Sequence, residues 1–215
     1  MEKIDIYDAN LKHLGIMDRK DAHLQGLWHT TFHCWLINNT NGGQILLQGR
    51  SSDMENFPDM LDVSAAGHIL AGEKIDEGVR EVEEELGIII NIKNLRFLGY
   101  RVEVADQTNG QKNREYQAVY LLKHDPNLFE YRPQIEEVDS LFWLNIDDGI
   151  NLLTGKQNSV KVKGIKYDKS SKNWTSHERE ITINELLPRI QSYYLTVLIM
   201  GQRFLSDNTL PLAIS

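Results

Sequence analysis

The chain has 215 residues, of which 41% are hydrophobic and 25% are charged, as in an ordinary soluble globular protein. The formal net charge of −8 argues against a nucleic-acid partner, because neutralising a phosphate backbone needs a basic surface. No apolar run approaches the length of about 18 residues that a membrane span needs, so we expect no membrane partner. Cys34 is the only cysteine and the N-terminal stretch lacks an apolar signal core, which together favour a cytoplasmic protein.

The N-terminal part of the chain is predicted to form mainly strands. Alternation over residues 3–7 indicates a strand that returns at 14–17 as a hairpin. Residues 18–26 are polar, and we expect a loop there. Residues 29–38 are β-branched and aromatic, which is typical of a core strand, and an Asn-Gly-Gly turn signal then predicts a returning strand at 44–48.

The middle of the chain predicts further strands around one acidic helix. Small residues at 62–66 indicate a short strand, and the helix is expected from about Asp76 to Leu86, with Gly87 at its C-cap. Two long strands are expected after it, followed by a core strand and a short helix, at 95–104, 114–123, 141–144 and 147–153.

The C-terminal part is predicted to form a hairpin and a helix. Alternation within residues 155–183 indicates a hairpin insertion. Apolar residues at helical spacing predict a helix over 184–206, with Asn184 as N-cap and Pro188 in the first turn, and the tail 207–215 is expected to be loose.

This order of elements predicts an α/β fold, namely a mixed central sheet with helices on its faces, an N-terminal hairpin and a C-terminal helix. We expect a single domain over residues 1–215, with its core at about 26–150. Such an arrangement is an α/β/α sandwich.

The feature that most needs an explanation is a run of carboxylates at residues 81–85. On a helix Glu81, Glu84 and Glu85 share one face, and their like charges repel. A hard divalent cation such as Mg²⁺ binds oxygen ligands and would remove this repulsion. The alternative interpretation is an acidic helix face exposed to water.

Residues 67–88 resemble the Nudix box, G-x5-E-x7-R-E-U-x-E-E-x-G-U, in which U is a bulky aliphatic residue. Gly67 and Glu73 match the first half, and residues 80–88 match each fixed position of the second half. The stretch between Glu73 and Arg80 has six residues where the pattern has seven, which affects the expected placement of Glu73 and not that of the helical carboxylates.

The resemblance implies the same sandwich fold and a metal-dependent hydrolase that cleaves a diphosphate linkage in a nucleoside- or isoprenoid-type substrate. It implies Mg²⁺ or Mn²⁺ bound by Glu81 and Glu85 with help from Glu84, and by a backbone carbonyl near Ala66 or Gly67. Water would be oriented or deprotonated by Glu84 or Glu81. Glu115 is a second candidate for that role.

Two arginines have candidate roles beside these carboxylates. Arg80 is expected to hold a box glutamate in position, and Arg50 is expected to contact a substrate phosphate. For each of them the simpler interpretation is a solvated charge.

Residues 18–143 resemble more specifically the type I isopentenyl diphosphate isomerase branch of this superfamily. The resemblance implies a second set of metal ligands at His23, His29, His68 and Glu115, although each could be an ordinary structural residue. The branch has a catalytic cysteine where this chain has Ala66, and Asn113 cannot supply its second carboxylate. These departures argue against isomerase activity and favour a hydrolase.

Several questions stay open at this point. The partner is expected to be a small-molecule diphosphate. The residues do not identify the chemical group X that is linked through the diphosphate, and a homodimer is left open. Besides the hydrolase and the isomerase, a non-catalytic ligand-binding module remains an alternative.

Overall fold

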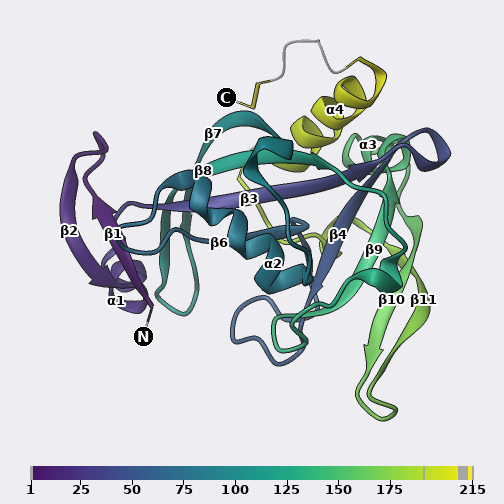
Figure 1. The fold of residues 1–215 in the computed structure, drawn as a ribbon, viewed down its shortest axis with the longest axis horizontal. Helices are drawn as coiled ribbons and strands as arrows, with labels where there is room; N and C mark the ends of the chain where they lie inside the picture. Colours follow the sequence, from purple (N-terminus) through teal and green to yellow (C-terminus); the bar gives the residue numbers. More distant parts are fainter. Residues whose placement is uncertain (1, 191, 208–212, 215) are drawn as a thin grey trace.

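The computed structural model describes residues 2–190, 192–207 and 213–214 (Figure 1). Within these residues the chain forms a nine-stranded sheet, a separate two-stranded sheet and four α-helices, joined by loops and short 3-10 turns. The strands and helices in chain order are β1 (Lys3–Tyr7), β2 (His13–Asp18), α1 (Arg19–Gln25), β3 (His29–Asn38), β4 (Gln44–Arg50), β5 (Leu61–Asp62), β6 (Ala65–His68), α2 (Arg80–Leu86), β7 (Leu95–Asp106), β8 (Lys112–Lys123), β9 (Val138–Asn145), α3 (Ile146–Leu153), β10 (Val160–Asp168), β11 (Asn173–Ile181) and α4 (Tyr193–Ser206).

The large sheet has the strand order β11-β10-β9-β4-β3-β8-β7, with β5 paired to β4 and β6 paired to β3. Strands β3 and β8 are parallel, whereas the other pairs are antiparallel, so the sheet is mixed as predicted. The hairpin β10–β11 joins this sheet through β9, so residues 160–181 extend the sheet.

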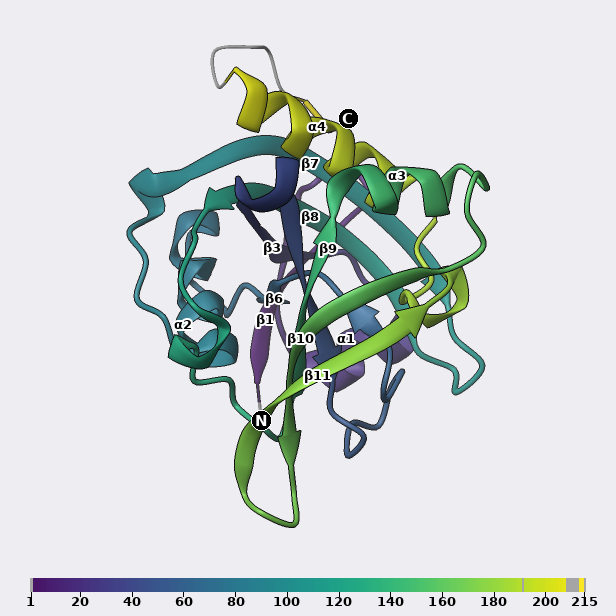
Figure 2. The same ribbon diagram turned by 90° about the vertical axis from the view of Figure 1, so that its right-hand side faces the viewer.

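Side chains that alternate along β3 build two cores, one on each face of the sheet. Trp35 and Ile37 pack in a cluster with residues of α3 and α4, whereas Cys34 and Leu36 pack in a cluster with residues of α2. Figure 2 shows α2 on one side of the sheet and α3 with α4 on the other. The predicted α/β/α sandwich is therefore confirmed.

Strands β3 and β4 separate soon after the turn that joins them. They pair only at Ile37–Ile45 and Asn38–Gln44, after which β3 pairs with β6 and β4 pairs with β5. The Ser64 hydroxyl lies at the point of separation, where it accepts from the Leu36 amide at 2.9 Å and donates to the Leu46 carbonyl at 2.6 Å. A space therefore opens between the two strands beyond Ser64.

The acidic helix is shorter than predicted. A 3-10 turn covers Ile75–Val79, and the α-helix begins at Arg80. The Glu77 carboxylate accepts from the Lys74 amide at 2.6 Å and stabilises the tighter turn. Gly87 adopts the left-handed conformation and ends the helix, as predicted.

The C-terminal helix begins at Tyr193, so its predicted start at Asn184 is wrong. Asn184 lies in a 3-10 turn capped by Thr182, and Pro188 precedes the helix. The Leu187 amide donates to the Leu61 carbonyl at 2.8 Å. The segment before α4 is therefore bound to β5 and does not form the hydrogen bonds of an α-helix at this point. Most of the tail for which a loose structure was expected lies outside the described residues.

Two smaller predictions were also wrong. Residues 18–26 were expected to form a loop, but α1 forms there because Ala22 and His23 are buried beneath an otherwise polar surface. The strand expected at 62–66 is divided into β5 and β6, since Ser64 bonds to both separating strands. No helix in the described part of the chain is long and apolar enough to cross a membrane.

Candidate active site

The space between β3 and β4 forms a cleft of about 690 Å³. One wall comes from α2 and β6, and the opposite wall comes from β4, β5 and the segment that precedes α4. The predicted site residues that line it are His23, Arg50, Ala66, His68, Glu81, Glu84, Glu85 and Glu115. His29 is fully buried behind this lining.

Helix α2 directs three of its four carboxylates, those of Glu81, Glu84 and Glu85, to the cleft and its apolar residues into the core. Val82 and Leu86 are fully buried in the core cluster on this face of the sheet. Glu81 and Glu85 are 8% and 7% exposed, whereas Glu84 lies at the open end of the site and is exposed. The acidic face is therefore not the solvated surface of the alternative interpretation.

The backbone of β6 is fitted closely to these carboxylates. The Ala66 amide donates to Glu85 Oε2 at 2.8 Å. A Cβ atom added at Gly67 would lie 2.1 Å from the Glu81 carboxyl carbon, so only glycine leaves room for this side chain. Gln48 of β4 donates to Glu85 from the other wall at 3.4 Å.

Arg80 joins the two halves of the acidic motif. Its guanidinium donates to Glu73 at 2.8 Å, to Glu81 at 2.6 Å and to Glu84 at 2.9 Å, and to the His68 carbonyl at 2.8 Å. The expectation that Arg80 holds a box glutamate agrees with these contacts. The loop that is one residue shorter than the pattern leaves Glu73 in direct contact with Arg80.

The electrostatics of this wall favour a bound cation. Burial, partly offset by Arg80, raises the pKa of Glu81 to about 7. Burial also raises the pKa of Glu85 well above its ordinary value, despite the hydrogen bond from Ala66. One guanidinium pairs with three carboxylates here, and the buried Glu85 adds a fourth beside Glu81, so a divalent cation would stabilise the ionised forms that burial penalises.

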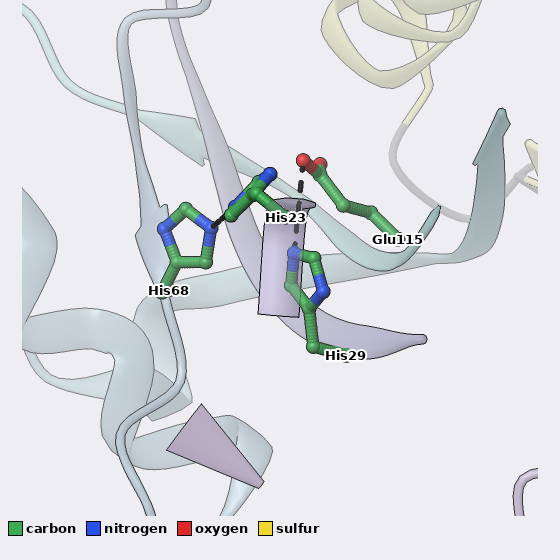
Figure 3. Close-up of side chains that lie close together, drawn as sticks. All are labelled: His23, His29, His68 and Glu115. Atoms are coloured by element: carbon green, nitrogen blue, oxygen red, sulfur yellow. Dashed lines mark hydrogen bonds and ion pairs between the residues drawn. The ribbon is translucent and has the colours of Figure 1, made fainter. Parts of the chain in front are cut away.

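A second group of ligand-type side chains meets at the other end of β6 (Figure 3). His23 of α1, His29 of β3, His68 of β6 and Glu115 of β8 each offer one ligand atom, and these atoms lie within 4.8 Å of one another. His23 Nε2 lies 3.0 Å from His68 Nε2, and His29 Nε2 lies 3.9 Å from Glu115. All four residues are buried.

The outer nitrogens of two of these histidines are engaged by oxygen acceptors. His29 Nδ1 lies 2.9 Å from the Leu27 carbonyl, and His23 Nδ1 lies 3.1 Å from Asn113 Oδ1. A proton on each Nδ1 leaves both Nε2 lone pairs directed into the group, and among the described residues the buried His29 Nε2 has no hydrogen-bond partner. This is the arrangement that metal-binding histidines adopt.

Burial also keeps two of the imidazoles neutral. It lowers the pKa of His23 to about 4 and the pKa of His68 well below its ordinary value; Arg19 adds to the shift at both residues, and Glu115 opposes it at His23. Neutral imidazole is the form that binds a metal ion. The donor set of three imidazoles and a carboxylate therefore fits a transition-metal ion.

Glu115 is held by neighbours that the sequence did not identify. Gln117 donates to Glu115 at 2.8 Å and accepts from Arg101 at 2.5 Å, and Arg101 forms a buried ion pair with Glu103. These residues alternate along β7 and β8 on one face of the sheet. Polar residues that alternate along predicted core strands were the sequence signal that could have identified these supporting residues.

A third group contains Arg50, Asp62 and Arg189. Arg50 donates to the Phe57 carbonyl at 3.1 Å and lies 3.8 Å from the Asp62 carboxylate. Arg189 donates to both oxygens of Asp62, at 2.6 Å and 2.9 Å. Of these three only Arg50 was a candidate from sequence, because Asp62 and Arg189 lie 127 positions apart and no local pattern connects them.

A model of the NUDIX domain family matches residues 27–163, which include the acidic helix and most of the cleft lining. The chain belongs to the NUDIX domain family. Hydrolysis of acid anhydrides in diphosphate-containing substrates is the general Nudix reaction, and members generally need divalent metal ions. The chain is accordingly an enzyme of the Nudix hydrolase class.

Similar proteins carry names from both branches considered above. An uncharacterized Nudix hydrolase of Clostridium acetobutylicum is 32% identical over 92% of this chain and 95% of its own length. Isopentenyl-diphosphate Delta-isomerase 1 of Photorhabdus laumondii is 31% identical over 69% of this chain and 82% of its own length. The presence of an isomerase among the similar proteins is consistent with the isomerase-like branch.

Solved structures agree on the fold. A crystal structure from Deinococcus radiodurans covers 73% of this chain and 91% of its own chain, with a TM-score of 0.56 and 24% identity. A Nudix hydrolase from Alicyclobacillus acidocaldarius covers 87% of this chain and 97% of its own, with a TM-score of 0.51 and 12% identity.

Proposed function

We propose that the enzyme hydrolyses the diphosphate linkage of a nucleoside- or isoprenoid-type diphosphate with Mg²⁺ or Mn²⁺ at the carboxylates of α2. The observation that carries this proposal is the burial of Glu81 and Glu85 beside a large open cleft, where burial alone would neutralise them. A helix without a functional reason to bury two carboxylates would expose them.

Each side chain on this wall has a proposed task. Glu81 and Glu85, with Glu84 and the carbonyl of Ala66, would hold the metal ion. The ion, when bound, neutralises charge that develops on phosphate oxygens. Glu81 or Glu84 would orient and deprotonate the attacking water.

Arg50 is proposed to bind a phosphate group of the substrate. Its guanidinium is held at the cleft by the carbonyls of Asn56 and Phe57, with distances of 2.9 Å and 3.1 Å. These acceptors are neutral, and the Asp62 carboxylate at 3.8 Å is shared with Arg189, so part of the positive charge of Arg50 is available to an anion.

His23, His29, His68 and Glu115 are proposed to hold a second ion, for which Mn²⁺ is the candidate shared with the first site. The unpartnered His29 Nε2 and the neutral state of His23 and His68 support this assignment. Glu115 would then serve as a ligand, and its candidacy as the base would be secondary.

Isomerisation of an isoprenoid diphosphate is the alternative, and the isomerase of Photorhabdus laumondii among the similar proteins is the observation that favours it. It needs an acid and a base on opposite sides of the substrate. Ala66 has no proton to exchange, and Asn113 is engaged with His23. Cys34 faces the α2 core and burial raises its thiol pKa, so it cannot replace the missing group.

A substrate panel separates these functions. Nucleoside diphosphate compounds and isopentenyl diphosphate would each be incubated with Mg²⁺ or Mn²⁺, and products read by phosphate release and chromatography. Metal-dependent release of phosphate or a monophosphate supports the hydrolase. Conversion of isopentenyl diphosphate to its allylic isomer without phosphate release would contradict it, and binding without either product would indicate a non-catalytic module.

A further inference from the structure

The segment before α4 completes one wall of the cleft although it lies outside the family match at residues 27–163. Leu186 forms a parallel bridge with Leu61 of β5, and the Leu187 amide donates to the Leu61 carbonyl at 2.8 Å. At its other end, Arg101 donates to the Ile190 carbonyl at 2.8 Å. Both ends of the segment are therefore tied to the sheet, which fixes Arg189 between them.

Arg189 lies in the cleft lining with an incompletely used guanidinium group. Its side chain is only 9% exposed, and its Nη2 donates to both oxygens of Asp62. Its buried Nε has no hydrogen-bond partner in the part of the chain that the structure describes. A buried donor without an acceptor is costly, which points to an acceptor that the protein itself does not supply.

The charges around Asp62 do not balance. Arg189 and Arg50 both form ion pairs with this one carboxylate. Burial acts to raise the pKa of Asp62, but the two guanidinium groups outweigh it and hold the pKa below its ordinary value, so Asp62 is ionised. Two cations against one anion leave an excess positive charge on this wall, opposite the carboxylates of α2.

Arg189 shares the cleft with residues of both candidate metal groups. The same lining contains Glu81 and Glu85 of α2 and, from the second group, His68 and Glu115. An anion bound at Arg189 would therefore lie in the cleft that both groups face.

We propose that Arg189, together with Arg50, forms an anion-binding subsite for a phosphate of the diphosphate substrate. This inference rests on the proposed function, because it assigns the cleft to a diphosphate. Charge-assisted hydrogen bonds from guanidinium to phosphate oxygen are among the strongest that proteins make, and arginine is suited to them by its planar set of donors. The C-terminal segment would thereby supply a substrate contact from outside the matched family region.

The competing explanation is that Arg189 only neutralises the buried Asp62. The two roles differ in what happens when both charges are removed. If Arg189 merely balances Asp62, the double variant D62N/R189Q restores anion binding that R189Q loses. If Arg189 binds the anion itself, the double variant stays defective, and D62N alone binds as tightly as the wild type or more tightly.

The test is calorimetric binding of inorganic pyrophosphate to the full chain in EDTA, so that no metal ion contributes. We expect R189Q and D62N/R189Q to bind about tenfold more weakly than the wild type, or worse. Arg96, an exposed arginine of β7, provides the matched control, and R96Q is expected to bind normally. Circular dichroism melting identifies any variant that is unfolded at the assay temperature.

Normal pyrophosphate binding by R189Q, or its recovery in D62N/R189Q, would overturn the inference. If R189Q does not fold, the double variant still decides the question, because it buries no unpaired charge. For a substrate that the wild type hydrolyses, R189Q should raise KM more than it lowers kcat. If the enzyme hydrolyses no diphosphate but its pyrophosphate binding still depends on Arg189, the proposed hydrolase function is wrong and the anion-binding subsite stands.

Discussion

Arg80 and His68 connect the two candidate metal groups. Arg80 Nη2 donates to the main-chain carbonyl of His68 at 2.8 Å, while His68 Nε2 lies 3.0 Å from His23 Nε2. Ala66, two residues earlier on β6, donates to Glu85. Strand β6 therefore positions the carboxylates through its backbone and the imidazole group through a side chain, so that a shift of this strand would disturb both.

Glu73→Gln tests how strongly Arg80 depends on its partner in the loop. The variant weakens the ion pair that sets the direction of the guanidinium, so Arg80 should hold Glu81 and Glu84 less firmly. We expect roughly a 10- to 100-fold loss in metal affinity or turnover, as for other residues that orient metal ligands. Turnover measured across a Mg²⁺ titration checks this, with Glu77→Gln on the exposed side of the same loop as control. Equal metal dependence in both variants would contradict the role given to Glu73.

Gly67→Ala should abolish activity without a general loss of folding. The added methyl group would occupy the position of the Glu81 carboxylate and displace it from the cleft. Gly201 in α4 is a matched control, because a Cβ there meets its nearest neighbours at 3.7 Å. Turnover and melting temperature are measured for both, and an active Gly67→Ala variant would mean that the position of Glu81 is unimportant.

Metal-free stability should depend on pH through Glu81. The pKa of Glu81 is 4.5 ordinarily and about 7 in the folded chain. Between pH 4.5 and pH 7 the folded state therefore keeps the Glu81 proton, whereas the unfolded state has released it. The stabilisation is complete below pH 4.5 and is lost as pH rises through about 7. Glu81→Gln lacks this dependence, so its melting temperature relative to wild type should increase over that range.

Mg²⁺ provides the control for this titration. By stabilising ionised Glu81, the ion should reduce the difference between wild type and Glu81→Gln above pH 7. A difference in melting temperature that stays constant with pH in EDTA would show that Glu81 does not titrate in this range.

His68→Gln should remove a transition-metal ion from the second group. The variant loses one of three imidazoles, and the remaining ligands bind more weakly. The protein is loaded with Mn²⁺, dialysed, and its metal content measured by mass spectrometry. His13→Gln, at an exposed histidine of β2 outside the group, is the control and should retain wild-type content. Equal metal content in both variants would contradict the assignment.

Much of the fold and of the acidic site was predictable because the relevant signals are local. The β-branched and aromatic residues of β3 and the turn after it predicted a core strand and its partner, and the spacing of Glu81, Glu84 and Glu85 predicted a shared face. The start of α4 was not predictable, since the hydrogen bond from Leu187 to Leu61 holds the preceding segment against β5.

The remaining site residues required the tertiary structure. Asp62 and Arg189 meet only because the segment before α4 packs on β5, and no sequence spacing encodes this contact. Gln117 supports Glu115 from two residues along β8, whereas Arg101 reaches Gln117 from β7, where register rather than sequence distance determines the contact.

The most direct measurement compares Glu85→Gln with Glu83→Gln on the diphosphate that the wild type hydrolyses, at saturating Mg²⁺. Glu85 is buried at the cleft and bonded to Ala66, whereas Glu83 is exposed on the same helix. We predict a loss of about a hundredfold or more in kcat for Glu85→Gln and wild-type turnover for Glu83→Gln, because a metal ligand supplies several kcal/mol to the transition state. Full turnover by Glu85→Gln would contradict the assignment of the α2 carboxylates as the catalytic centre.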